Sequence, residues 1–86
     1  MPNEKPTQKT ITFTIEDDGE KKYRYFLRSV YDALEEKGFD PVNQIVGYIL
    51  SDDPTYITSY KNARTMICKM DRNELLHMLV SSFLKV

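Results

Sequence analysis

The chain has 86 residues, with 12 basic against 13 acidic side chains and a formal net charge of −1 at pH 7. This length predicts one domain with a small core, and such cores often need a disulfide, a metal or a second subunit. A single cysteine, Cys68, excludes an internal disulfide, and a single histidine, His77, leaves few ligands for a metal. We therefore expect a homodimer without cofactors. The isoelectric point near 5.8 disfavours a dedicated nucleic-acid-binding protein, which usually carries a basic excess.

We expect a flexible N-terminal arm (1–18) followed by a helical dimerisation domain (19–86). Residues 1–9 are polar. Residues 10–15, TITFTI, alternate strictly between threonine and apolar side chains, which is a strand signal. No second strand is predicted, so this segment pairs with its copy, joins the sheet of a partner, or stays mobile. The mobile arm is the favoured interpretation, with an acidic hinge at 16–19.

The sequence also predicts the compartment. The start of the chain lacks the apolar core of a signal peptide, and no segment approaches the roughly 18 apolar residues of a membrane span. A lone cysteine fits a reducing environment. We therefore expect a cytoplasmic protein that does not insert into membranes.

Residues 21–37 form the clearest predicted helix. Its apolar side chains recur at helical spacing: Tyr23, Phe26, Leu27, Val30, Tyr31 and Leu34. Gly38 is expected to end this helix in the left-handed conformation. Asp40 is expected to cap the next helix, and Pro41 suits its first position, where no N–H is needed.

The next predicted helix runs through residues 42–50 and contains Gly47. A glycine inside a helix costs about 1 kcal/mol relative to alanine. We therefore expect a second helix to pass close to Gly47. The segment 53–57 predicts one helical turn.

Two more helices are predicted in the last third of the chain. Ser59 is the expected cap of a helix over residues 60–70. Asp71 and Glu74 form a variant of the capping box at the start of the last helix, 71–84. The sequence thus predicts an all-α fold, a small bundle of about four main helices plus one helical turn.

No pattern of residues points to catalysis. A catalytic histidine needs a nucleophile or an orienting carboxylate, and the sequence places neither beside His77. Cys68 as a redox sensor would need a lowered pKa, and a place on the helix surface is the simpler interpretation. The aspartate pairs 17–18 and 52–53 are more simply a hinge and a helix end than metal ligands. We expect no enzyme activity.

The segment 61–72 carries four basic residues and one acidic residue, a local charge of 4 − 1 = +3. The basic residues are Lys61, Arg64, Lys69 and Arg72. They form either a solvated helix face or a docking surface for an acidic partner or a phosphate. An alternative function is a small helical nucleic-acid-binding protein that uses this helix, and a salt-dependent gel shift would support it.

The run GFDPVNQIVGYILSDDPTYI, with VYDALEEKG before it and KNAR after it, resembles the IreB family. The resemblance spans residues 10–84. Members are small cytoplasmic regulatory phosphoproteins of Gram-positive bacteria, phosphorylated on a tail threonine by a membrane Ser/Thr kinase. Thr10 stands at the matching position, and Thr7 resembles a secondary site. Relatives adjust cell-envelope synthesis, and in some species the unmodified form promotes proteolysis of the enzyme that commits precursors to peptidoglycan.

The resemblance also implies partners. They are a second copy, the kinase with its cognate phosphatase, and a peptidoglycan-precursor enzyme or its protease machinery. The basic helix is implicated in partner contact, and all four of its basic residues match basic positions of the family. Ser59 and Cys68, however, stand where relatives commonly carry arginine. Our hypothesis is that the phosphorylated arm folds over the basic helix and competes with an acidic partner.

Overall fold

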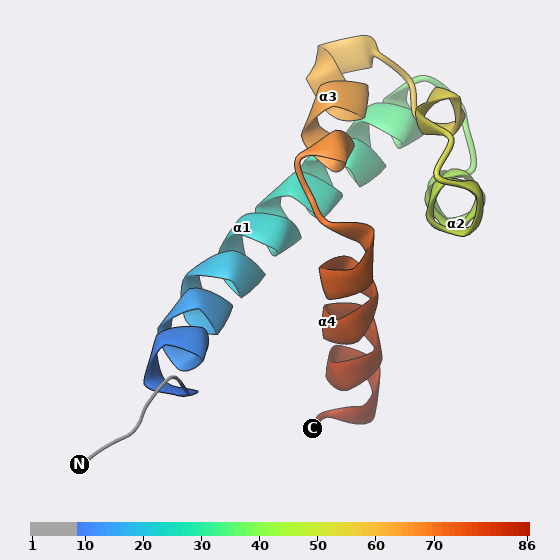
Figure 1. The fold of residues 1–86 in the computed structure, drawn as a ribbon. Helices are drawn as coiled ribbons and strands as arrows, with labels where there is room; N and C mark the ends of the chain where they lie inside the picture. The colour runs from blue at the N-terminus through green and yellow to red at the C-terminus, as the bar shows by residue number, and fades with distance from the viewer. Residues whose placement is uncertain (1–8) are drawn as a thin grey trace.

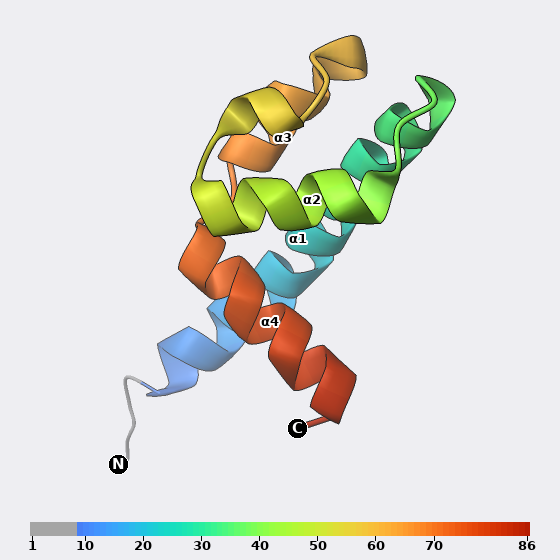
Figure 2. The same ribbon diagram turned by 90° about the vertical axis from the view of Figure 1, so that its right-hand side faces the viewer.

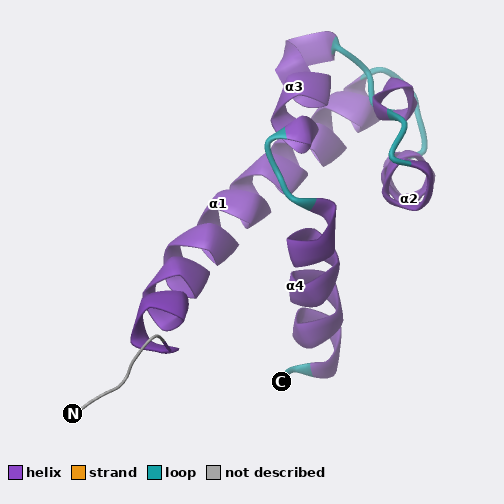
Figure 3. Cartoon of the chain, viewed as in Figure 1, coloured by secondary structure: helices purple, strands orange, loops and turns teal. Residues whose placement is uncertain are grey.

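The structure is a computed structural model that describes residues 9–86, with residues 9–18 described by their backbone alone. The elements of this part of the chain are α1 (Lys9–Glu36), α2 (Pro41–Ser51), the 3-10 turns η1 (Pro54–Tyr56) and η2 (Tyr60–Asn62), α3 (Ala63–Cys68) and α4 (Arg72–Leu84) (Figure 1). Residues 9–86 contain no strand (Figure 3). The predicted all-α class is therefore confirmed.

The first helix, α1, begins at Lys9, well before the predicted start at residue 21. It includes residues 10–15, which therefore form a helix in spite of their strand signal, and it runs through the predicted hinge at 16–19. An unpaired strand leaves its N–H and C=O groups without protein partners, whereas a helix pairs them internally. Extending an existing helix also avoids the cost of a new nucleus. The helix crosses the expected boundary at residue 18. The flexibility of the arm stays a prediction.

The connection from α1 to α2 confirms the predicted end and start signals. Gly38 has a φ of +85°, and the next N–H, that of Phe39, donates to the carbonyl of Leu34 at 3.0 Å. This pattern closes the last turn of α1. The side chain of Asp40 accepts a hydrogen bond from the N–H of Asn43 at 3.2 Å, and Pro41 occupies the first position of α2.

The segment between η1 and α3 differs from the predicted continuous helix over residues 60–70. Lys61 and Asn62 have positive φ angles of 52° and 62°, and Ser59 makes no side-chain cap. The N–H of Tyr60 instead donates to the hydroxyl of Thr58 at 3.2 Å. This turn brings residues on both of its sides into one core. The stability gained by burying them outweighs the stability that a continuous helix would provide.

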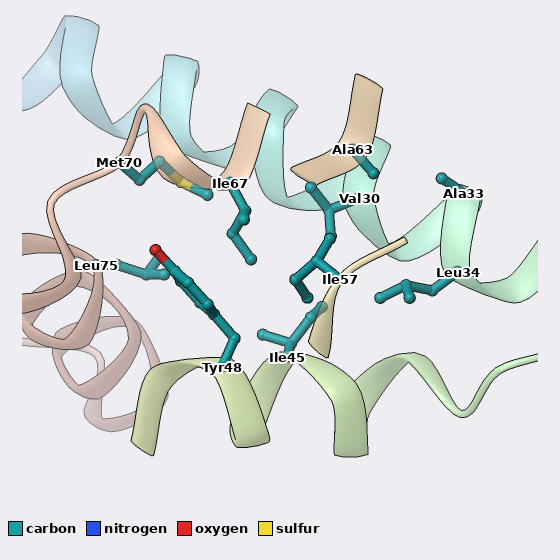
Figure 4. Close-up of a cluster of buried hydrophobic side chains, with 10 residues drawn as sticks. All are labelled: Val30, Ala33, Leu34, Ile45, Tyr48, Ile57, Ala63, Ile67, Met70 and Leu75. Carbon is teal, nitrogen blue, oxygen red and sulfur yellow. The ribbon is translucent and has the colours of Figure 1, made fainter. Parts of the chain in front are cut away.

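The core lies between α1, α2 and α3 and includes the first turn of α4. Figure 4 shows its side chains converging from these elements. They are Val30, Ala33, Leu34, Ile45, Tyr48, Ile57, Ala63, Ile67, Met70 and Leu75.

A Cβ atom on Gly47 would lie 2.5 Å from Cδ1 of Tyr56, a residue of η1. The close neighbour of this glycine is therefore an aromatic ring, and the predicted crossing helix is wrong. The side-chain amide of Gln44 donates to the carbonyl of Tyr56 at 2.8 Å and holds η1 against α2. The predicted helical turn at 53–57 is confirmed as η1.

The last helix, α4, leaves the bundle after its first turn. Leu75 is 2% exposed, but exposure rises to 55% at Val80 and 87% at Phe83. Figures 1 and 2 show α4 diverging from the N-terminal half of α1. Asp71 caps α4 as predicted, because its side chain accepts from the N–H of Glu74 at 3.1 Å. Within the described residues, no helix is both long enough and apolar enough to cross a membrane.

Candidate partner-binding site

The four basic residues of the segment 61–72 do not form a single stripe. Lys61 and Lys69 contact side chains of α1. Arg64 and Arg72 contact backbone carbonyls next to η1 and in α2. The turn at Lys61 and the break between α3 and α4 interrupt this segment, so its basic residues do not share one helix face.

Lys61 is an exposed cation whose position is fixed by α1. Its Nζ lies 3.2 Å from Oε1 of Glu36, and the hydroxyl of Tyr60 donates to the same carboxylate at 2.9 Å. Hydrogen bonds from Tyr60 and then Lys61 lower the pKa of Glu36. The hydrogen bond to Glu36 raises the pKa of Lys61. Lys61 thus stays charged, and one acidic partner already shares that charge.

Lys69 follows the C-terminal end of α3. Its Nζ lies 5.9 Å from the ring centroid of Phe26 on α1. This distance is at the outer limit of a cation–π contact, so the ring holds the ammonium group only weakly. Lys69 is exposed and can reach a partner without breaking an ion pair among the described residues.

Arg64 is half-buried on α3. Its Nε donates to the carbonyl of Ile57 at 2.8 Å, which fixes the guanidinium against the chain after η1. Asp53 lies nearby, and hydrogen bonds from the hydroxyl and N–H of Thr55 lower the pKa of this carboxyl, with a smaller contribution from Arg64. A fixed guanidinium with further N–H groups suits a carboxylate or phosphate ligand.

Arg72 is used inside the molecule. One terminal nitrogen, Nη1, donates to the carbonyl of Ile49 at 2.6 Å, and Nε lies 3.2 Å from Oδ1 of Asp52. Both acceptors belong to the C-terminal end of α2, where carbonyl groups lack helical partners. The structure therefore places Arg72 between α4 and α2, where it stabilises the fold.

The two residues that the sequence analysis considered for chemistry, Cys68 and His77, have different surroundings. Cys68 is exposed at the end of α3, beside the hydroxyl of buried Tyr48. Burial, and then the proximity of Cys68, raise the pKa of that tyrosine. His77 instead lines a hollow between α4 and α1, together with Glu20 and Ser81.

The candidate phosphorylation sites are at the start of the chain. Thr10 lies in the first turn of α1, and Thr7 lies outside the described residues. Phe26, the residue under Lys69, lies sixteen positions after Thr10 along α1, which corresponds to about 24 Å along the axis at about 1.5 Å per residue. Figure 1 shows α3 packed near the opposite end of α1. Docking of Thr10 on the basic helix of the same chain would therefore require α1 to break.

The sequence interpretation missed an open apolar groove of about 510 Å³ between α1, α2 and α4. Leu27 and Tyr31 of α1, Val42 and Val46 of α2, and Leu79 of α4 line it. Arg24 and Arg28 lie at its edge on α1. The apolar spacing of α2 and α4 contained this signal, but sequence alone assigned those side chains to the core.

These features define a small all-helical protein with a divided basic surface and a continuous apolar groove. Exposed apolar surface of this kind is typical of proteins that act through contacts with other macromolecules. The model of the family "IreB regulatory phosphoprotein" matches residues 8–85. A UPF0297 protein of Ruminiclostridium cellulolyticum is 47% identical over 76 residues, which cover 88% of this chain and 86% of the relative. The chain belongs to the IreB family, and the predicted family is confirmed.

Proposed function

We propose that this chain is a non-enzymatic cytoplasmic regulator of peptidoglycan synthesis, switched by a membrane Ser/Thr kinase and its cognate phosphatase. The main support for this proposal is the match over residues 8–85 to the IreB family, whose members are described as regulatory phosphoproteins. The absence of a predicted catalytic constellation agrees with a protein that acts by binding. Its downstream partner is a peptidoglycan-precursor enzyme or the protease machinery that removes it.

The proposed phosphorylation sites are Thr10 and, secondarily, Thr7. Thr10 stands at the N-terminal end of α1, where the first N–H groups have no helical partners. The first turn of α1 contains no acidic residue. A phosphate there adds about −1.5 to −2 charges at a helix end that favours negative charge. The modification therefore changes both the charge and the order of this segment.

The proposed working form is a homodimer. Supporting it, α4 exposes a row of apolar side chains beyond its first turn: Leu76, Leu79, Val80, Phe83 and Leu84. On α2, Val42, Val46 and Leu50 are exposed as well. A second copy of the chain is always present to cover these apolar surfaces. A two-fold axis would pair the same surface on both copies. Association of two copies would bury this row and the groove together.

The proposed contact with a downstream partner uses Lys61, Lys69 and Arg64. Lys61 and Lys69 are exposed, and Arg64 is held rigidly with N–H groups to spare. Their charges suit an acidic partner surface, and charge-assisted hydrogen bonds are the strong ones. Arg72 supports this surface from within the fold and contributes less direct contact.

A pull-down from the native cytoplasm tests this function. The baits are unmodified protein, protein phosphorylated at Thr10, and a Lys61→Ala/Lys69→Ala double variant. We expect the unmodified bait to retain a peptidoglycan-precursor enzyme or a protease component, and the other two baits to retain much less. Identical sets of captured proteins from the modified and unmodified baits would refute the switch, and an unchanged set from the double variant would refute the contact surface.

A further inference from the structure

The first turn of α4 is held from the side of α1 by one hydroxyl group. The hydroxyl of Tyr23 donates to Oε1 of Glu74 at 2.7 Å and accepts from the N–H of Asp71 at 3.0 Å. It therefore bonds both the cap residue of α4 and a side chain in its first turn. These partners lie 48 and 51 residues away in sequence, so the contacts are purely tertiary.

Arg72 holds the same turn from the side of α2. Its guanidinium bonds the carbonyl of Ile49 at 2.6 Å and the carboxylate of Asp52 at 3.2 Å. Its side chain is 37% exposed, so solvent screens these charges only in part. Tyr23 and Arg72 thus tie the start of α4 to two different helices.

Beyond this turn, α4 has little else to fix its direction. Leu75 is the one residue of α4 in the buried core of the described chain, and all residues after it are exposed or only partly buried. A helix anchored only at one end pivots about that end unless directional contacts oppose the motion. The hydrogen bonds of Tyr23 and Arg72 are directional, whereas the packing of Leu75 is not.

We propose that Tyr23 and Arg72 are positioning residues that set the direction of α4, and that they thereby shape the groove through which a second copy binds. This inference rests on the proposed homodimer. It assigns Arg72 a role within the chain, distinct from the direct partner contact that its charge suggested. Loss of either residue leaves the α1–α3 core intact but lets α4 sample several directions.

The size of the effect follows from the population of the competent direction. Both copies of a two-fold dimer must keep α4 in place, so the apparent dissociation constant rises by the inverse square of the fraction of molecules that do so. If about a third of them keep it, the dissociation constant rises about tenfold.

The test compares Tyr23→Phe and Arg72→Gln with the wild type and with Lys37→Ala. Tyr23→Phe removes only the hydroxyl. Lys37→Ala removes one positive charge at the far end of α1, where Lys37 lies 5.0 Å from the ring of Tyr60. NMR residual dipolar couplings measure the direction of α4 relative to α1, and sedimentation equilibrium measures dimerisation. We call the contacts of Tyr23 and Arg72 with the start of α4 the clamp. We expect both clamp variants, Tyr23→Phe and Arg72→Gln, to change the α4 couplings and to weaken the dimer about tenfold, and Lys37→Ala to change neither.

The two measurements separate the inference from the proposed function. Unchanged α4 couplings in both clamp variants would overturn the clamp, whatever the dimer does. Changed couplings in a protein that sediments as a monomer would support the clamp and overturn the homodimer. If Arg72→Gln weakened the dimer without moving α4, Arg72 would be a direct interface contact and the inference would be wrong.

Discussion

Single carboxylates cap the starts of α2, η1 and α4. Asp40 and Asp71 each accept a hydrogen bond from an N–H three residues ahead, at 3.2 and 3.1 Å. The carboxylate of Asp53 accepts from the N–H of Thr55 at 3.0 Å and so starts η1. Each such cap contributes about 1 kcal/mol and defines where an element begins. Short helices joined by tight turns depend on these local contacts more than long helices do.

Gly47 gives a residue-scale prediction with a matched control. Gly47→Ala places a methyl group against the ring of Tyr56 and should lower the free energy of unfolding by about 1–3 kcal/mol through overpacking. Gly19 also lies in a helix, but a Cβ atom there meets nothing within 4 Å. Gly19→Ala should therefore stabilise the protein by up to about 1 kcal/mol. Urea unfolding measures both variants, and a gain of stability in Gly47→Ala would show that the ring moves aside freely.

The Glu36–Lys61 pair gives a prediction on pH. The pKa of Glu36 in the folded protein lies below its ordinary value of 4.5, so the unfolded chain binds this proton first as the pH falls. The pair's contribution is therefore present above about pH 4.5 and declines below it. Glu36→Gln should make the acid limb of the stability curve less steep, as measured by thermal melts between pH 3 and pH 6. Equal slopes for the variant and the wild type would mean that solvent screens the pair completely.

At the scale of elements, α1 differs most from its sequence pattern. The threonine-rich alternation of residues 10–15 favours a strand, but a strand gains stability only through a neighbour, and the described chain offers none. Helical continuation needs no partner and extends an element already stabilised by the core at Val30 and Leu34. The proposed phosphorylation at Thr10 would therefore act on the end of a helix.

This placement predicts that phosphorylation increases helix content. A phosphate in the first turn of α1 interacts favourably with the helix dipole, by about 0.3–1 kcal/mol or more. Circular dichroism at 222 nm should show a more negative signal for protein phosphorylated at Thr10. The control is Thr10→Ala treated with the same kinase, which should keep its signal. A less negative signal after phosphorylation would indicate that the modified segment leaves the helix, as the docking hypothesis requires.

At the scale of the whole molecule, the surface is unevenly divided between polar and apolar residues. The apolar row of α4 and the groove beside α2 meet on one side, while the basic residues Lys61 and Lys69 lie toward α1. In the proposed homodimer, this separation would let one surface join the two copies while the other stays open to a partner.

The dimer prediction concerns Phe83, which is largely exposed near the end of α4. Light scattering at micromolar concentration should give about twice the chain mass of 10.1 kDa for the wild type. Phe83→Glu should shift the mass towards that of the monomer, because a charge in an apolar interface has no partner. The control is Tyr25→Ser, which removes an exposed aromatic side chain outside the groove. A wild-type protein that is monomeric at these concentrations would contradict the dimer.

The sequence by itself determined the family and the all-α class. It also determined where α1 ends and where α2 and α4 begin, because caps such as Gly38 and Asp71 act over a few residues. Only the tertiary structure decided which apolar faces are buried. Leu75 and Phe83 belong to the same apolar pattern in the sequence, but Leu75 is buried in the core and Phe83 is exposed to solvent. Their burial differs because α4 leaves the bundle after its first turn. It also decided the role of Arg72, because its acceptors on α2 lie far away in sequence. Charge and periodicity are local properties, whereas burial and bonding partners depend on residues that only folding brings together.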